Sequence, residues 1–345
     1  MSDKGTVLVT GGSGFIGGWC VIALLQQGYT VRTTVRDLKR EAGVRATLGK
    51  AAPEAVNAER LKFYAADLTS DAGWDAATQG CEFVLHVASP LGVAEPKNPD
   101  DLIVPAREGA KRAVGAAIKA GVKRVVLTSS VAATSKGPSG PTESVSDETV
   151  WTDPAEPGVS AYSRSKTLAE RAAWDLIKTS GGKTTLATVN PALVLAPVLS
   201  NDFSDSVQVI QRLLSGKVPG LPRLGLNIVD ARDVADLHIR AMTMPEAAGQ
   251  RFIAAGKFAW MAEMAALLRA RLGADAAKVP TRKVPDFVLR FVALFDRELG
   301  GVTGGLGKKR DYSSAKAQTL LGWKPRPMED TIIECAKSLI ATGAV

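Results

Sequence analysis

The sequence holds few of the residues from which metal sites and disulfide frameworks are built. It has 2 histidines and 3 cysteines in 345 residues, and the cysteines lie far apart with no C-x-x-C spacing: Cys20, Cys81 and Cys335. We therefore expect no bound metal, and three thiols that behave as small buried hydrophobic side chains. His86 falls within an apolar run and is expected to be a packed strand residue rather than a catalyst.

Long apolar runs are also missing, and we expect no leader segment. No stretch approaches the roughly 20 apolar residues of a membrane-spanning helix, and the first expected strand begins almost at residue 4. We therefore expect a cytoplasmic protein with no membrane partner. The net charge of +8 comes from scattered basic residues without interleaved aromatic ones, which predicts no nucleic-acid partner.

The stretch from Thr6 to Gly17 predicts a strand, a glycine turn and the first turn of a helix in immediate succession. The spacing Gly11-x-x-Gly14-x-x-Gly17 supplies a tight turn, a close approach to phosphate and close packing of helix on strand. A helix N-terminus offers N–H groups to an anion, and the Ser13 hydroxyl adds a contact. The pattern therefore predicts a site for the pyrophosphate of a dinucleotide.

The second strand, expected over residues 30–35, completes a βαβ unit and indicates which dinucleotide fits. Val35 stands where an NAD-binding unit usually carries an acid, and Arg36 follows it directly. A guanidinium suits a ribose 2′-phosphate by charge and by geometry, so NADP is favoured over NAD. Lys39 and Arg40 lie close enough to assist. The alternative is a solvated surface arginine.

Further strands are expected over residues 61–65, 83–87, 125–128 and 185–190. Asp67 follows the first of these and is placed either to accept from an adenine amino group or to cap a helix. Small residues after residue 87 let a dinucleotide lie across the strand ends. The candidate cofactor-binding residues of the glycine turn and the strand ends are Gly11, Ser13, Gly14, Phe15, Ile16, Gly17, Arg36, Lys39, Asp67, Leu68, Val87, Ala88, Ser89 and Thr128.

Three residues are candidates for the chemistry: Ser130, Tyr162 and Lys166. Tyr162 and Lys166 stand at i and i+4 at the start of an expected helix, on one face and one turn apart. A carbonyl that takes a hydride needs a proton on its oxygen, which a tyrosine supplies if its pKa is lowered. The lysine charge favours phenolate and its ammonium reaches the nicotinamide ribose, so both residues also count as cofactor-binding. Ser130 would hydrogen-bond the substrate oxygen.

These motifs resemble the extended short-chain dehydrogenase/reductase superfamily over nearly the whole chain. The matching segments are TGGSGFIG, ADL at residues 66–68, HVASP at 86–90, LTSS at 127–130, YSRSK at 162–166 and NPALVLAP at 190–197. Within it, the dihydroflavonol reductase, cinnamoyl-CoA reductase and aldehyde reductase branch is most similar, through GYTVRTTVRD, DETVWTD and YSRSKTLAERAAW.

The resemblance implies a Rossmann-type doubly wound parallel sheet with a smaller C-terminal substrate-binding lobe. The expected NADP-binding domain is 1–195, with a sheet return near 226–255, and 196–345 is mainly the substrate lobe. The resemblance also implies that Ser130 rather than Ser129 is the catalytic serine, and that Pro191 and Val194 pass near the nicotinamide amide. Plant members hold a flavonoid with an asparagine where Ser135 stands here, which argues against dihydroflavonol.

The substrate pocket is expected to be mostly apolar, which favours an aryl or alkyl carbonyl compound over a phosphorylated sugar. Its candidate residues, each of which is also compatible with a place in the core, are Ser89, Leu91, Val131, Ala192, Leu195, Phe203 and Val207.

The leading hypothesis is an NADPH-dependent reductase that converts an aldehyde or ketone to an alcohol, reversibly, as a monomer or a homodimer. Three alternatives stay open: a nucleotide-sugar epimerase, a hydroxysteroid dehydrogenase and a non-catalytic NADP-sensing regulator. The epimerase usually prefers NAD and an acid after the second strand, which Val35 and Arg36 do not provide.

Overall fold

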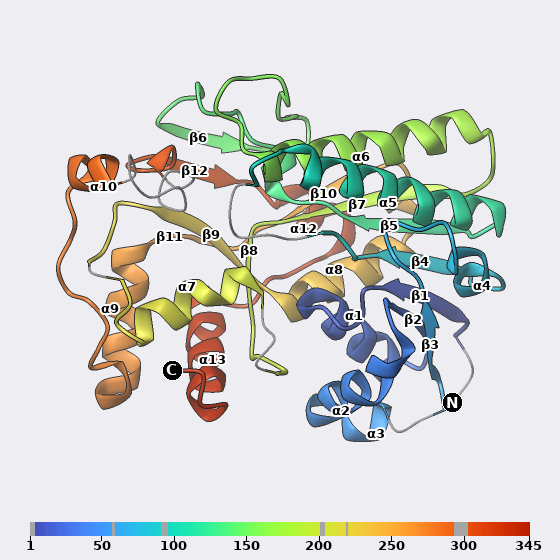
Figure 1. Cartoon of the computed structure of the whole chain (residues 1–345), viewed down its shortest axis with the longest axis horizontal. Coiled ribbons are helices and arrows are strands. Elements are labelled where there is room, and N and C mark those ends of the chain that lie inside the picture. Colours follow the sequence, from blue (N-terminus) through green and yellow to red (C-terminus); the bar gives the residue numbers. More distant parts are fainter. Residues whose placement is uncertain (1–3, 57–58, 91–95, 201–203, 219, 293–302) are drawn as a thin grey trace.

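A parallel sheet of seven strands lies at the centre of the computed structural model, which describes residues 4–56, 59–90, 96–200, 204–218, 220–292 and 303–345 (Figure 1). The strand order is β10-β7-β5-β4-β1-β2-β3. The bounds are β1 Thr6–Thr10, β2 Thr30–Val35, β3 Leu61–Ala65, β4 Phe83–His86, β5 Arg124–Thr128, β7 Thr185–Pro191 and β10 Arg251–Ala254. The order reverses between β1 and β4, where such sheets bind ligands beyond the carboxyl ends of their strands. The doubly wound fold class is therefore confirmed.

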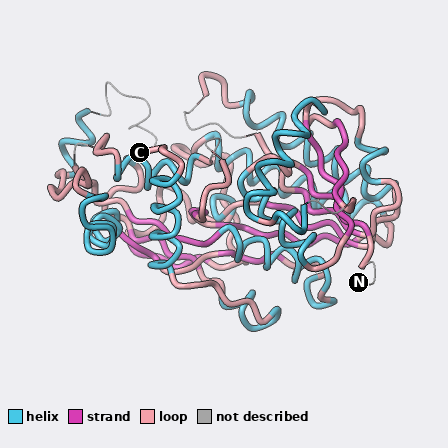
Figure 2. The backbone as a smooth tube through the Cα atoms, turned by 90° about the horizontal axis from the view of Figure 1, so that it is seen from below, coloured by secondary structure: helices cyan, strands magenta, loops and turns pink. Residues whose placement is uncertain are grey.

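Helices cover both faces of this sheet because its strands are apolar on both sides (Figures 1 and 2). Val7 and Val9 pack in one core with α1 (Phe15–Gln26) and α8 (Ala231–Thr243), whereas Leu8 packs in a second core on the opposite face. That face is covered by α4 (Trp74–Thr78), α5 (Asp100–Lys119) and α6 (Ala161–Ser180).

A separate core lies under the C-terminal lobe, at the left of Figure 1. A three-stranded sheet of order β11-β9-β8 packs there against α7, α9 and α13. The bounds are β8 Leu193–Leu195, β9 Gly225–Asp230, β11 Phe258–Trp260, α7 Asp205–Leu214, α9 Met261–Leu272 and α13 Met328–Ala341. Of the expected sheet return near residues 226–255, β10 joins the large sheet beside β7, whereas β9 pairs with β8 and β11.

A two-stranded sheet joins distant parts of the chain. β6 (Glu143–Ser146) pairs in parallel with β12 (Lys309–Tyr312), so the segment before α6 carries a strand. Among the described residues, the other helices are α2 Glu41–Ala51, α3 Pro53–Val56, α10 Asp286–Val292 and α12 Ala315–Leu321. The 3₁₀ helices there are η1 Leu38–Arg40, η2 Val131–Ala133, η3 Pro245–Ala247 and η4 Gly273–Ala276.

Within the described ranges, no helix combines the length and the apolar character that crossing a bilayer requires.

Candidate active site

The glycine turn is packed so closely that it has no room for side chains at Gly11, Gly12 and Gly17. Gly11 has φ +69°, a backbone conformation that favours glycine, and its carbonyl accepts a hydrogen bond of 2.9 Å from the Gly14 N–H. A Cβ atom on Gly17 would lie 2.2 Å from that carbonyl oxygen. The Gly12 N–H is tied to Thr33 Oγ1 of β2 at 3.0 Å. The turn is thus a rigid cradle that fits a pyrophosphate at the N-terminus of α1.

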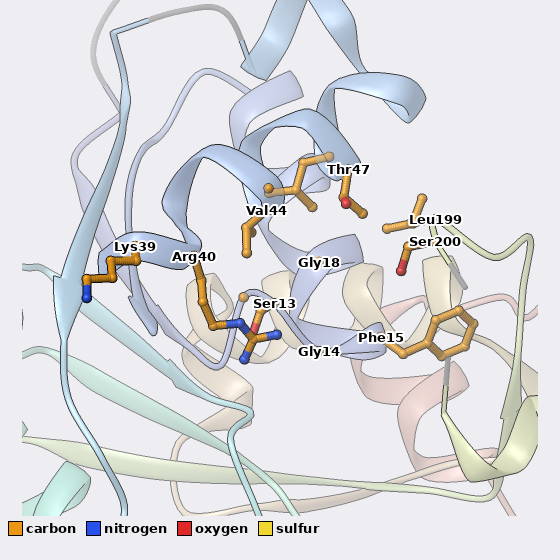
Figure 3. Close-up of a pocket in the computed structure, with 13 residues that line it drawn as sticks. Ser13, Gly14, Phe15, Gly18, Lys39, Arg40, Val44, Thr47, Leu199 and Ser200 are labelled. Atoms are coloured by element: carbon orange, nitrogen blue, oxygen red, sulfur yellow. The ribbon is translucent and has the colours of Figure 1, made fainter. Parts of the chain in front are cut away.

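A cavity of about 390 Å³ opens beside this turn (Figure 3). The Arg40 side chain reaches toward Ser13, whereas Lys39 points away from the turn (Figure 3). Arg40 is therefore better placed than Lys39 to meet an anion at the glycine turn. The cavity is lined by Gly12, Ser13, Gly14, Phe15, Gly18, Lys39, Arg40, Gly43, Val44, Thr47, Leu48, Leu199 and Ser200. Leu199 and Ser200 come from a distant part of the chain, and no local sequence signal points to them.

Arg36 and Asp67 follow neighbouring strands of the sheet. Arg36 is exposed beyond the end of β2. Hydrogen bonds from Thr69 lower the pKa of Asp67, and the charge of Arg36 acts in the same direction. Asp67 Oδ1 accepts from the Thr69 N–H at 2.8 Å, so its carboxylate holds a local turn. The half-buried Leu68 side chain packs against a small core that contains Trp74.

The ends of β1 and β4 are bound together by one hydroxyl. Thr10 Oγ1 accepts hydrogen bonds of 3.0 Å from the N–H groups of Val87 and Ala88, and lies 2.9 Å from His86 Nδ1. His86 is buried, and burial together with the Lys166 charge lowers its pKa to about 3. His86 is therefore a neutral packed strand residue, as expected. The half-buried segment from Val87 to Ser89 follows it at the sheet edge.

Ser130, Tyr162 and Lys166 are brought together at the carboxyl end of β5 and the start of α6. The helix begins where Ser160 Oγ accepts a hydrogen bond from the Ser163 N–H at 3.1 Å. Lys166 Nζ then lies 5.7 Å from the centre of the Tyr162 ring. A side-chain hydrogen bond joins Ser130 to Tyr162. The spacing of the two α6 residues and the loop after β5 thus produce one cluster.

Burial sets the protonation of this cluster. It raises the pKa of Tyr162, with Asp205 acting in the same direction and the Ser130 hydrogen bond opposing it. The lowered tyrosine pKa that the sequence suggested is therefore wrong for this structure, because the cost of burying a phenolate dominates. Burial lowers the pKa of Lys166 to about 8, against the nearby charge of Glu170. Near neutral pH the cluster holds a protonated tyrosine and a charged lysine.

Most of the chain matches the sequence model of a known family. The profile of the NAD dependent epimerase/dehydratase family matches residues 7–255. The chain belongs to this family. Cinnamoyl-CoA reductase 1 of Petunia hybrida is 36% identical over 341 residues, which are 98% of this chain and 92% of that protein. An anthocyanidin reductase ((2S)-flavan-3-ol-forming) of Vitis vinifera is 35% identical over 292 residues, 81% of this chain and 83% of that protein.

Solved structures agree with this epimerase/dehydratase assignment. The yeast methylglyoxal/isovaleraldehyde reductase complexed with NADPH superposes with a TM-score of 0.79 at 25% identity, over 99% of this chain and 100% of that one. Together these similarities confirm the resemblance to the extended short-chain dehydrogenase/reductase superfamily and its reductase branch. They also confirm the expected enzyme class, an oxidoreductase.

The remaining candidate cofactor-binding residues of this family member are buried or partly buried. Thr128 Oγ1 is bonded to His238 Nε2 at 2.7 Å in the buried interior, so its side chain serves the fold. Pro191 ends β7 and Val194 lies in β8, both buried. Phe15 and Ile16 pack partly buried at the start of α1.

The predicted substrate pocket falls only partly within the described residues. Val131 and Ala192 are half-buried near the strand ends. Leu195 and Val207 are 0% exposed within the core of the C-terminal lobe, where they support the lobe. Ser89 is half-buried. Leu91 and Phe203 lie outside the described residues.

Proposed function

We propose that the chain is an NADPH-dependent carbonyl reductase that converts an aldehyde or ketone to an alcohol, reversibly. The observation that carries this proposal is the cluster of Ser130, Tyr162 and Lys166 at the carboxyl end of β5. It stands on the sheet whose glycine cradle, at the end of β1, fits a pyrophosphate. A dinucleotide laid along the strand ends would bring its nicotinamide to this cluster.

NADPH would be held by the glycine cradle at its pyrophosphate and by cationic side chains at its 2′-phosphate. When bound, it supplies the hydride. Arg36 and Arg40 are the side chains proposed for the phosphate, with Lys39 near them. The family name mentions NAD, yet Val35 leaves no acid at the end of β2 to bind a ribose 2′-hydroxyl. This difference favours NADPH in the present chain.

The proton in this reaction would come from Tyr162. Because burial raises its pKa, the phenol stays protonated at neutral pH and is ready to donate to the substrate oxygen. Ser130 Oγ, which accepts from the Ala132 N–H at 3.1 Å, would donate its own proton to the same oxygen and fix its position. Lys166 would stabilise the phenolate that remains and bind the nicotinamide ribose. The reverse reaction, oxidation of the alcohol, needs the Tyr162 phenolate, so its rate should increase with rising pH.

The substrate class follows from the lining and from the relatives. The half-buried Val131 and Ala192 favour an apolar substituent on the carbonyl carbon. The names of the relatives mention cinnamoyl-CoA, anthocyanidin, methylglyoxal and isovaleraldehyde. The first is a thioester, the second is an unsaturated aromatic ring system, and the last two are carbonyl compounds. We propose an aryl or alkyl aldehyde or ketone as the substrate.

The test follows NADPH absorbance with purified protein and a panel of aromatic and aliphatic aldehydes and ketones. Oxidation of NADPH that depends on a carbonyl compound, and is slower with NADH, is the expected result. Conversion of nucleotide sugars with no net use of cofactor would instead favour the epimerase alternative. NADPH binding without any turnover would favour the sensing regulator and overturn the proposal.

The organisation of the molecule is proposed on the same grounds. Residues 1–195, with the sheet return near 226–255, would form the cofactor-binding domain. Residues 196–345 would mainly form the substrate lobe, since β8, β9, β11, α7, α9 and α13 share a separate core. We propose a cytoplasmic monomer or homodimer, with its three cysteines buried and free. Light scattering of the purified protein and imaging of a tagged chain test these two points.

A further inference from the structure

A fully buried carboxylate stands on the catalytic helix without a part in the proposed reaction. Glu170 is 0% exposed and lies one turn of α6 beyond Lys166. Its hydrogen-bond donors are Ser129 Oγ at 2.6 Å, Arg251 Nε at 2.7 Å, Asn190 Nδ2 at 2.9 Å, Thr188 Oγ1 at 3.0 Å, and Arg251 Nη2 and Trp174 Nε1 at 3.4 Å. An isolated buried charge is costly, so a shell this complete indicates a specific task.

Arg251 connects the hydrogen bonds around Glu170 to two segments beside the site, the loop before α6 and the 3₁₀ turn after β5. It is the first residue of β10, and its Nη1 donates to the carbonyls of Glu148 at 2.7 Å and Val150 at 2.9 Å. Its Nη2 lies 3.4 Å from the Ala133 carbonyl at the end of the 3₁₀ turn that Ser130 caps. The guanidinium also stacks 3.7 Å from the centre of the Trp151 ring. One side chain thus ties this turn to the loop before α6.

Asn190 links the carboxylate to the catalytic serine. Its Nδ2 donates to Glu170 at 2.9 Å and also to the backbone carbonyl of Ser130 at 3.1 Å. Ser129 is held by its own hydroxyl on the same carboxylate. Glu170 therefore anchors the residue before Ser130 directly and, through Asn190, the backbone carbonyl of Ser130 itself, so it is placed to fix the direction of the Ser130 hydroxyl.

The same carboxylate acts on Lys166. The titratable groups that face this lysine are Tyr162 and Glu170 from α6 and His86 from β4, while Arg251 of β10 faces Glu170. His86 is neutral at physiological pH because its pKa is about 3. Glu170 is the group that opposes the effect of burial on the lysine ammonium.

We propose that Glu170, clamped by Arg251, is a positioning residue that fixes Ser130 against α6 and maintains the charged form of Lys166. This inference rests on the proposed reductase function and adds to it a residue that touches neither substrate nor cofactor. In this proposal the Glu170 carboxylate aligns two catalytic residues that lie on different elements, Ser130 and Lys166.

The test replaces Glu170 by glutamine and compares it with Asp175→Asn, an exposed carboxylate on the same helix. For Glu170→Gln we expect a kcat at least about tenfold lower, in the range of effects on positioned acid–base groups. We also expect the alkaline limb of its pH profile to move down by about one unit. Asp175→Asn should keep the parent profile. An NMR titration of isotope-labelled lysine should show that the pKa of Lys166 falls by the same amount. The Lys166 signal is assigned as the one that disappears in the Lys166→Arg variant.

Folding is separated from positioning by further variants. If Glu170→Gln does not fold, the double variant Glu170→Gln/Arg251→Met removes both charges and is expected to fold with the same two defects. Ser129→Ala keeps the carboxylate, so it should lower kcat severalfold without moving the alkaline limb. A folded Glu170 variant with parental kcat and parental Lys166 titration overturns the inference. If the parent protein reduces no carbonyl compound, the proposed function fails, and the lysine titration still decides the role of Glu170.

Discussion

Ser129 and Ser130 are neighbours in the chain, yet their hydroxyls serve different parts of the molecule. Ser129 Oγ donates to buried Glu170 at 2.6 Å, whereas Ser130 is hydrogen-bonded to Tyr162. The extended backbone at the end of β5 turns successive side chains to opposite sides. This alternation separates a supporting residue from one that would meet the substrate.

Replacing Ser130 by alanine should therefore lower kcat/KM for carbonyl reduction by about 100-fold or more, the loss found when one donor to a developing oxyanion is removed. The NADPH dissociation constant should change little, since the hydroxyl faces the substrate. Steady-state kinetics and NADPH fluorescence titration provide the measurements. A Ser129→Ala loss equal to that of Ser130→Ala would contradict the assignment.

Tyr162→Phe should abolish most of the reduction while keeping the fold. The phenol is the proposed proton donor, and removing such a group costs about 100-fold to 10,000-fold in rate. Tyr64→Phe is the matched control, because Tyr64 lies in β3 and stacks on Arg32. Its kcat should stay within about twofold of the parent, as is usual for changes remote from the chemistry. Undiminished turnover in Tyr162→Phe would exclude this tyrosine as the donor.

The rate of reduction should be flat near neutral pH and fall as the pH rises through about 8. Burial lowers the pKa of Lys166 from 10.5 to about 8, so the lysine is charged below that pH and neutral above it. Loss of the charge removes stabilisation of the tyrosine phenolate formed in the reaction. A pH profile of kcat measured with saturating NADPH checks this limb. A profile that stays flat to pH 10, the ordinary range for lysine, would contradict it.

Much of this site was predictable because its signals are local in the sequence. The glycine spacing, the residues after each strand and the i, i+4 pair of Tyr162 and Lys166 depend only on the regular geometry of strand and helix. Strand β9 was missed as a partner of β8 because it follows a Pro- and Gly-rich run and pairs with a distant segment. Glu170 was missed because a charged residue on a helix usually faces solvent, and its partners outside α6 come from three distant segments: the end of β5, β7 and β10.

The tyrosine pKa was predicted in the wrong direction for a related reason. A neighbouring lysine charge is visible in the sequence, whereas the degree of burial of a phenol depends on the whole fold. Burial is the largest influence on Tyr162 in the structure.

Arg36→Ala and Arg40→Ala should each weaken NADPH binding by about tenfold or more while leaving NADH binding almost unchanged. The 2′-phosphate is the only anionic group that distinguishes the two cofactors, and a bidentate guanidinium contact to it is a strong hydrogen bond. Lys62→Ala is the control, since it removes one exposed positive charge from neighbouring β3. Fluorescence titrations with both cofactors, repeated at higher salt, check the effect. An equal loss of NADH affinity would place these arginines elsewhere than at the 2′-phosphate.

Gly17→Ala should damage both the fold and cofactor binding. Its Cβ atom would lie 2.2 Å from the Gly11 carbonyl oxygen and 2.9 Å from the carbonyl carbon, and these backbone atoms cannot yield without opening the glycine turn. Overpacking of this kind costs about 1–3 kcal/mol of the free energy of unfolding. Displacement of the turn should also weaken NADPH binding at least about tenfold, which corresponds to ~1.4 kcal/mol.

Gly49→Ala separates this close contact from the general effect of adding a methyl group. Gly49 lies in α2, and nothing stands within 4 Å of the position of its Cβ atom. Alanine is the better helix former, so this variant should gain up to about 1 kcal/mol in stability. Its NADPH affinity should match that of the parent. Urea unfolding and NADPH titration of both variants would show opposite changes in stability, and equal behaviour would mean that the turn at Gly11 tolerates a side chain from α1.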